Sequence, residues 1–495
     1  MKILAEVVPS LSDPATHADK VSARHAVAED QKAYVHFSWR VWGATSLLAG
    51  WGALSANPLL TPVAIVVLVG CAQLLWRRGE PPVLVFACFM QWLQAAGVIF
   101  YSDYHGVSIT QASGSFEFEL ATWLSLLAIP VLALGMRFAL IRCKTSQNLA
   151  LRAEGLRVDV VKAFILYLLG FGIAVGAAVV AFTIPALTQL IYALITVKWM
   201  AVFVLAYCVL EQRKGYAFLT FAVLVEFGFG FLGYFSAFKS VFFVLLVAAL
   251  TSPLALRGRR LLLTAMIAVV LFSTGIVWTA IKQEYRGFLN QGSEQQIVAV
   301  SMEESVGKLG ELLSNLSWDG VQEGLDGLVL RVSYTKFFAL TIINVPNSMP
   351  FEHGALWLGA LKHVVTPRLF FPEKAALSDS DRTSLYTGVQ VTGDEQGTSI
   401  GIGYVAESYI DFGPIFMFVP IFLLGLFYGL IYRIFAIHSH HRLIGTSIAT
   451  SILIFGAYTI ETSNIKLVGG NFTAVLVMGI LYKVFGKPLK AWLEY

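Results

Sequence analysis

Long apolar segments recur along most of this chain, and they constrain its fold more than any other feature. Twelve of them approach the roughly 20 residues that an α-helix needs to cross a bilayer. Inside a bilayer, backbone polar groups must be paired within the chain, so such segments fold as helices. The composition agrees: 57% of the 495 residues are hydrophobic and only 13% are charged, against about 25% charged residues in soluble domains. The sequence therefore predicts an all-α, polytopic membrane protein.

The predicted spans divide the chain into five parts. These are an N-terminal tail (1–36), nine helices (37–281), one large polar loop (282–413), three more helices (414–486) and a C-terminal tail (487–495). The twelve spans are residues 37–54, 58–76, 83–101, 120–140, 160–182, 186–210, 216–235, 241–256, 261–281, 414–434, 443–460 and 472–485. The first contains Arg40 and the last is short, so these two are the least typical.

Lys and Arg gather in alternate connections, which predicts the orientation of the chain. The cationic connections contain Arg77, Arg78, Arg142, Lys144, Arg152, Arg157, Arg213, Lys214, Arg257, Arg259, Arg260, Arg433, Arg442, Lys487 and Lys490. Short loops rich in Lys and Arg mark the cytoplasmic side. Both tails are therefore expected in the cytoplasm and the loop 282–413 outside. This bias also accounts for most of the net charge of +4, so the charge does not argue for nucleic-acid binding.

The large loop is expected to contain short helices. Residues 291–327 are acidic and amphipathic in places, which predicts a surface helix, and residues 331–343 predict a second helix. The apolar stretch 354–365 is only about a dozen residues long, which favours a surface-lying or re-entrant helix over a full span. Residues 404–413 then lead into the tenth span.

Cationic side chains in and beside this loop are candidate ligands for a diphosphate. They are Arg286, Arg331, Lys336, Arg368, Lys374 and Arg382, with Lys239 at the start of the eighth span. Arginine can bind phosphate oxygens through two parallel hydrogen bonds. The alternative for each residue is contact with anionic lipid headgroups.

The same loop carries candidate general bases. They are Glu352, His353, His363, Glu407 and Asp411. Glu407 and Asp411 stand four residues apart, so they share one face of a helix, and carboxylates near a span are costly unless they are used. The alternative is that they cap or orient the tenth helix.

No metal or cofactor is expected. The four cysteines form no C-x-x-C motif, H-E-x-x-H is absent, and the loop 282–413 lacks cysteine. The segment Asp379-Ser-Asp381 matches the D-x-D pattern of some nucleotide-sugar transferases, but those substrates are cytoplasmic. Within the spans, Lys198 and Glu226 are predicted to form a structural ion pair, with a proton relay as the alternative.

Three segments resemble a known family. They are FKS at 238–240, TPRLFFPEK at 366–374 and GIGYVAESYIDFG at 401–413. Together with the layout of spans around one large outer loop, they resemble the Wzy-type polymerases of bacterial O-antigen and exopolysaccharide pathways. The likeness covers about the C-terminal half of the chain.

The resemblance implies a metal-independent glycosyl transfer at the outer face of the bacterial inner membrane. The substrates would be oligosaccharides linked to undecaprenyl diphosphate, and a chain-length regulator and a flippase of the same pathway would be possible partners. The matching motifs assign Arg368 and Lys374 to the diphosphate and Glu407 to the base. The other candidates rest on residue type and position: Arg331, Arg286, Lys239, Lys336 and Arg382 as ligands, and His363 or Asp411 as bases.

Two other functions remain open at this point. An O-antigen ligase uses the same donor and has a similar large loop. A transporter or flippase of lipid-linked sugars would also have about twelve helices, although such proteins are usually built from repeated halves, and no repeat is visible here.

Overall fold

The chain is almost entirely helical. The computed structural model describes residues 34–141, 143, 148–183, 188–232, 238–251, 258–293, 298–366, 371, 378–391, 399–459 and 461–494. Within these residues every named regular element is a helix. The prediction of an all-α fold is therefore confirmed.

Seven helices in the described residues are long and apolar enough to cross a membrane. They are α4 (Val83–Tyr104), α6 (Phe116–Ala139), α8 (Val160–Thr183), α9 (Thr188–Gln212), α12 (Gly258–Leu289), α19 (Phe418–Tyr432) with its π-helical turn Arg433–Ile437, and α21 (Asn464–Glu494). The protein is a multi-pass membrane protein.

The remaining helices are shorter. Five of them are apolar: α3 (Leu60–Leu75), α10 (Tyr216–Leu232), α11 (Lys239–Thr251), α16 (Ala355–Val365) and α20 (Arg442–Tyr458). The others are α2 (Trp39–Gly52), α5 (Ile109–Ser113), α7 (Asn148–Arg157), α13 (Met302–Ser314), α14 (Trp318–Val332), α15 (Thr335–Asn344), α17 (Asp379–Thr387) and α18 (Gly403–Phe416). The large loop thus contains short helices, as predicted.

Each predicted span overlaps a helix, but only seven of these helices are long and apolar enough to cross a membrane, so the number of twelve spans stays a prediction. Several bounds also differ. The ninth span was expected to end at residue 281, whereas α12 continues to Leu289. The last span looked short, yet α21 has 31 residues. The first corresponds to α2, which has only 14 residues. Helices extend beyond the apolar segments because the backbone hydrogen bonds of a helix continue through charged residues. A prediction from hydropathy ends the span at those charged residues.

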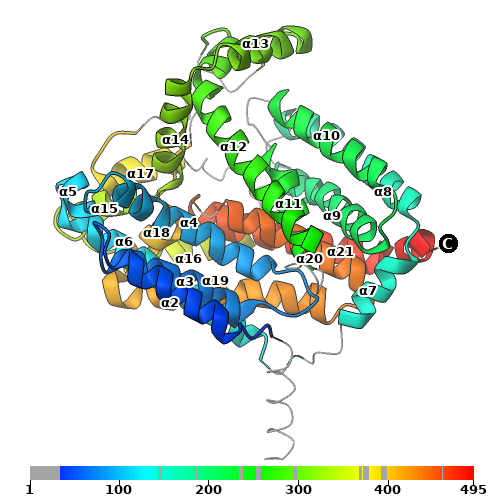
Figure 1. The fold of residues 1–495 in the computed structure, drawn as a ribbon, viewed down its shortest axis with the longest axis horizontal. Coiled ribbons are helices and arrows are strands. Elements are labelled where there is room, and N and C mark those ends of the chain that lie inside the picture. Colours follow the sequence, from blue (N-terminus) through cyan, green and yellow to red (C-terminus); the bar gives the residue numbers. More distant parts are fainter. Residues whose placement is uncertain are drawn as a thin grey trace, which may run out of the picture.

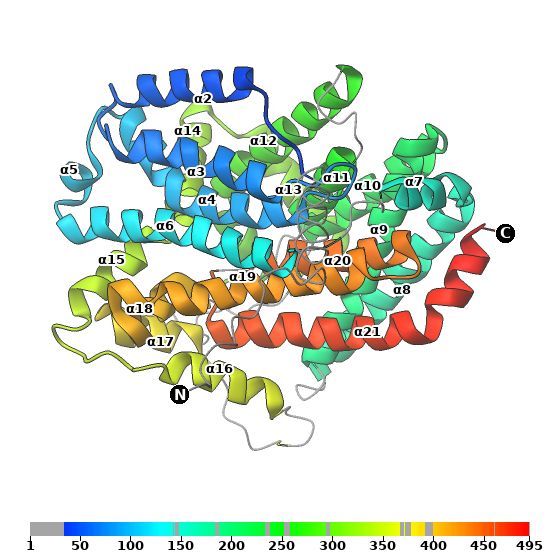
Figure 2. The same ribbon diagram turned by 90° about the horizontal axis from the view of Figure 1, so that it is seen from below.

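The helices form layers with one projecting arm. In Figures 1 and 2, α2, α3, α4 and α6 lie side by side, with α19 against α6. The helices α8, α9, α10 and α11 form a second group, and α20 and α21 pack on α9. The outer part of α12 projects from these layers together with α13 and α14 (Figure 1). We call α12, α13 and α14 the arm.

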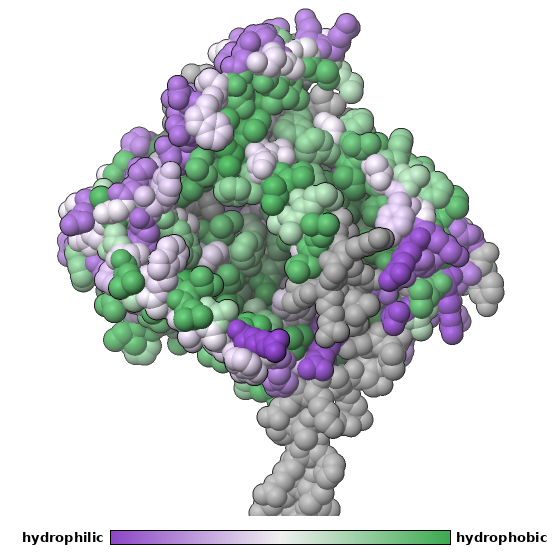
Figure 3. Space-filling view, in the orientation of Figure 1, coloured by the Kyte–Doolittle hydropathy of each residue, from purple (hydrophilic) through white to green (hydrophobic). Residues whose placement is uncertain are grey.

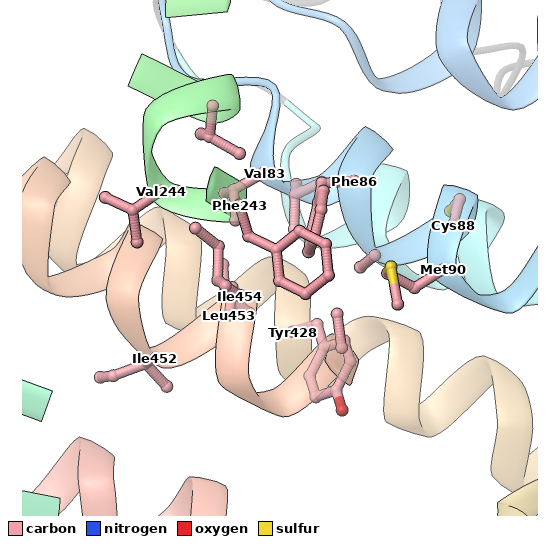
Figure 4. Packing of buried hydrophobic residues seen from close by; sticks show 14 of the residues in the cluster. Val83, Phe86, Cys88, Met90, Phe243, Val244, Tyr428, Ile452, Leu453 and Ile454 are labelled. Atoms are coloured by element: carbon pink, nitrogen blue, oxygen red, sulfur yellow. The ribbon is translucent and has the colours of Figure 1, made fainter. Parts of the chain in front are cut away.

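The core lies where α4, α11, α19 and α20 meet. Figure 4 shows Phe86 of α4 next to Phe243 of α11, with Tyr428 of α19 nearby. The rings of Phe86 and Phe243 are 5.2 Å apart at their centres and lie edge to face, a favourable aromatic geometry. Apolar side chains from segments distant in sequence therefore hold the layers together.

Glycines bring α6 and α19 into close contact. A Cβ atom at Gly425 of α19 would overlap the carbonyl oxygen of Leu132 on α6, and one at Gly135 would overlap that of Phe422. Small residues allow membrane helices to approach at backbone distance, which strengthens dispersion contacts. The α6–α19 contact thus depends on the lack of a side chain at these positions.

Gly425→Ala is expected to lower the free energy of unfolding by about 1–3 kcal/mol, the usual cost of overpacking. The matched control is Gly97→Ala on α4, where an added Cβ meets no atom within 4 Å and helix propensity favours alanine. Thermal unfolding of both variants in detergent would measure the difference. Equal stability of the two variants would contradict the close packing.

The helix ends bring together the loops predicted to share a side. At one end, Glu154 accepts hydrogen bonds from the Leu443 N–H and from Lys490. At the other, Asp103 accepts from Asn57. This grouping agrees with the alternation of cationic loops. Which end faces the cytoplasm stays a prediction, and we call the Asp103 end the predicted outer end.

An ion pair lies between the apolar helices α9 and α10. Lys198 Nζ is 2.7 Å from Glu226 Oε2, and the Tyr167 hydroxyl donates to Glu226 Oε1 at 3.3 Å. Both charges lie in apolar surroundings, where a lone charge is costly. The predicted pair is confirmed.

Candidate functional site

Glu407 of α18 is completely buried and held by two partners at the predicted outer end. Its Oε1 accepts from Arg382 of α17 at 2.9 Å, and its Oε2 accepts from the backbone N–H of Asn464 at 2.9 Å. Burial raises the pKa of Glu407 to about 7, although Arg382 and the Asn464 N–H favour the charged form. Because both oxygens are occupied, this geometry favours a structural role, and catalysis by Glu407 stays a prediction.

A second buried carboxylate lies beside the first. Asp379 at the start of α17 is 3.1 Å from Lys466 Nζ, which lies on α21. Asp381 of the D-x-D segment is exposed. Among the described residues, no group of three or more His, Cys, Asp or Glu side chains could hold a metal ion. Asp379 therefore helps to join α17 to α21.

Asp411 caps a helix other than the one expected. Its Oδ1 and Oδ2 accept from the backbone N–H groups of Leu356 and Trp357, at 3.0 and 2.9 Å. These groups open α16, where free N–H groups and the helix dipole favour an anion. Burial raises the pKa of Asp411, and these hydrogen bonds oppose the rise. The alternative role as a cap fits Asp411, with α16 in place of the tenth helix.

Helix α18 connects most of the polar loop. Besides Glu407 and Asp411, its Ser408 accepts a hydrogen bond from the Trp357 indole at 3.0 Å, and its Tyr409 hydroxyl donates to the Val345 carbonyl at 3.1 Å. The helix bends at Gly413, whose φ of 69° suits glycine. Side chains on several sides of α18 thus hold segments from the end of α15 to the start of α21.

Two of the predicted candidates lie on other helices of the loop, and two lie outside the described residues. Lys336 is exposed on α15, and His363 lies partly buried on α16. Arg368 and Lys374 lie outside the described residues. The two strongest motif-based assignments therefore stay predictions.

Cationic residues converge where α11, α12 and α14 meet. Lys282 of α12 lies within electrostatic range of Arg331 at the end of α14, Arg286 of α12 and Lys239 at the start of α11. We call Lys239, Lys282, Arg286 and Arg331 the cation cluster. Three of its members were predicted diphosphate ligands, and the fourth follows from the extension of α12 beyond residue 281.

Glu461, in the short connection between α20 and α21, lies within electrostatic range of Lys239 and Arg331 of the cation cluster. Burial raises its pKa, while Lys239 and Arg331 favour the charged form. The side chain of Gln94 donates to Glu461 Oε2 at 3.3 Å, and Tyr334 also lies within electrostatic range. The four residues of the cation cluster are therefore accompanied by one carboxylate, Glu461, whose pKa is raised.

A pocket opens beside this carboxylate. It is lined by Gln91, Gln94, Ala95, Ser125, Tyr334, Thr335, Phe338 and residues 402–406. Gln91 Nε2 and the Tyr404 hydroxyl are buried, and neither has a hydrogen-bond partner among the described residues. Buried polar atoms are normally paired, and these two unpaired atoms belong to side chains that line the pocket.

Sequence reasoning missed Glu461, Gln94 and Lys282. One signal could have indicated Glu461: it is the only carboxylate in the short connection 461–471, directly after an apolar span. An ionisable residue at the edge of a membrane span is a functional candidate. Gln94 lies inside a span and gives no comparable signal.

Comparison with known proteins identifies a family without a described function. No curated protein and no solved structure matches the chain. A family model described as "Domain of unknown function (DUF8712)" matches residues 82–482, which include the cation cluster, Glu461 and the pocket. The chain belongs to this DUF8712 family.

Proposed function

We propose that this protein polymerises oligosaccharide repeat units carried on undecaprenyl diphosphate at the outer face of the bacterial inner membrane. The observation that carries the proposal is the convergence of the cation cluster and Glu461 beside one pocket. Several cations suit a diphosphate, and a carboxylate with a raised pKa suits a general base. The resemblance of segments 238–240, 366–374 and 401–413 to Wzy-type polymerases supports the same reaction.

In the proposed reaction, a hydroxyl oxygen of the acceptor sugar attacks the anomeric carbon of the donor. A glycosidic C–O bond forms, and the bond from that carbon to the phosphate oxygen breaks. The electron pair leaves with the lipid diphosphate, whose added charge is stabilised by Arg331, Lys282 and their neighbours. Glu461 takes the proton of the attacking hydroxyl.

The surface near the cluster suits a lipid-linked substrate. Figure 3 shows a hollow between the arm and the layer of α3 and α4, and much of its visible surface is hydrophobic. A polyprenyl chain is apolar and gains free energy by leaving water. Such a surface supports entry of the substrate from the bilayer toward the cation cluster.

The glycans that accumulate in a strain lacking this protein test the proposal. We expect single repeat units on lipid diphosphate, exposed at the outer face, with long polymer restored by the wild-type gene. Lipid-linked polymer that is never transferred would identify a ligase. Repeat units retained at the inner face would identify a flippase, and unchanged glycans would refute all three.

A further inference from the structure

The helix α13, in the arm, has an exposed apolar stripe. Met302, Val306 and Leu313 are 61%, 52% and 47% exposed. At 3.6 residues per turn these three side chains lie within about 60° of one another on the helix. A fourth large apolar side chain, Trp318, follows at the start of α14 and is 73% exposed.

The other faces of α13 have different surroundings. Ser305 and Leu312 are buried, and Lys308 Nζ is 3.0 Å from Glu284 of α12, so these positions face the protein. The remaining side of the helix carries Glu303, Glu304 and Glu311, which are exposed. The exposed apolar stripe therefore lies between a face that packs on α12 and an acidic face.

The stripe lies on a helix that packs on α12, and α12 has exposed apolar side chains of its own. This helix is a candidate span whose apolar window is only 17% buried inside the protein. Its exposed side chains include Leu262, Met266, Val269 and Phe272. Figure 3 shows hydrophilic side chains along the far edge of the arm and hydrophobic surface over α12 beneath it.

We infer that α13 lies in the interface of the bilayer, with Met302, Val306, Leu313 and Trp318 in lipid and the acidic face in water. Helix α13 packs on α12, a candidate membrane-spanning helix whose apolar side chains are mostly exposed on the protein surface. Four side chains on about 20 Å of helix fall far short of the 20–30 residues of a stable protein interface. Tryptophan is also enriched at membrane interfaces. This inference does not depend on the proposed function.

Site-directed fluorescence in lipid nanodiscs tests the inference. Val306→Cys and Leu313→Cys would each carry an environment-sensitive thiol label, and Glu303→Cys on the acidic face is the matched control. The native cysteines in the described residues are buried, and labelling of the wild type gives the background. Nitroxide groups on lipid acyl chains and aqueous iodide serve as the two quenchers.

We expect the nitroxide lipids to quench the labels at 306 and 313 at least twofold more strongly than the label at 303. Iodide should show the reverse order. Equal quenching by iodide at all three positions would overturn the inference, because the stripe would then face water. Labels at 306 and 313 that neither quencher reaches would also overturn it, because a protein partner or a second copy would then cover the stripe.

Discussion

Glu461→Gln is expected to slow polymer formation at least about 100-fold, since a positioned general base typically contributes a factor of 10²–10⁴. The amide keeps the shape of the side chain but cannot take a proton from the attacking hydroxyl. The measurement is the rate of chain extension by the reconstituted protein supplied with lipid-linked repeat units. The proposal predicts this loss for a residue that the family resemblance does not indicate.

The matched control is Glu303→Gln, which makes the same change at an exposed position of α13. Its rate should equal that of the wild type. Both variants should unfold at the wild-type temperature, so that a slow rate reports on chemistry and not on folding. A fully active Glu461→Gln protein would exclude Glu461 as the base, and the cation cluster would then need a different catalytic partner.

Glu407→Ala is expected to lower the free energy of unfolding by about 3–5 kcal/mol at pH 8, the usual cost of removing one member of a buried ion pair. The substitution leaves Arg382 without its carboxylate and the Asn464 N–H without an acceptor. Thermal or denaturant unfolding in detergent would measure the change. Glu323→Ala, at an exposed position of α14, should change stability by less than about 0.5 kcal/mol.

The pH dependence of stability gives a second readout for Glu407. Burial raises its pKa from 4.5 to about 7, so between these values the folded protein holds the proton more tightly than the unfolded chain. The contribution of this group is therefore largest below pH 4.5 and declines as the pH rises to about 7. Glu407→Gln should remove this decline, and an unchanged pH profile would contradict the raised pKa.

Hydropathy and charge predicted the fold well because the bilayer imposes simple rules. Each of the twelve apolar segments overlaps a helix, and short helices were expected in residues 291–365 of the polar loop, whereas α17 was not expected. The extent of individual helices was less predictable. Residues such as Lys282 and Arg286 end an apolar window without ending a helix. Helix α12 is therefore about two turns longer than the predicted span, and these two turns carry Lys282 and Arg286 of the cation cluster.

The candidate site was only partly predictable, because it depends on which segments meet in space. Arg331, Arg286 and Lys239 were expected from residue type, and they do converge. Glu407 was the favoured base because a carboxylate near a span is costly. Sequence alone could not show that Arg382 and Asn464 occupy its two oxygens, whereas Glu461, which is 54 residues later, faces the cations.

The position of α18 has a consequence for biosynthesis. Its residues Glu407, Ser408, Tyr409 and Asp411 bind residues that lie 51 to 64 positions earlier in the chain and one that lies 57 positions later. A ribosome makes the earlier of these segments before it makes α18. The segments at the end of α15 and the start of α16 therefore cannot reach their final packing until α18 has been synthesised. Chains truncated before residue 403 should be targets for proteolysis.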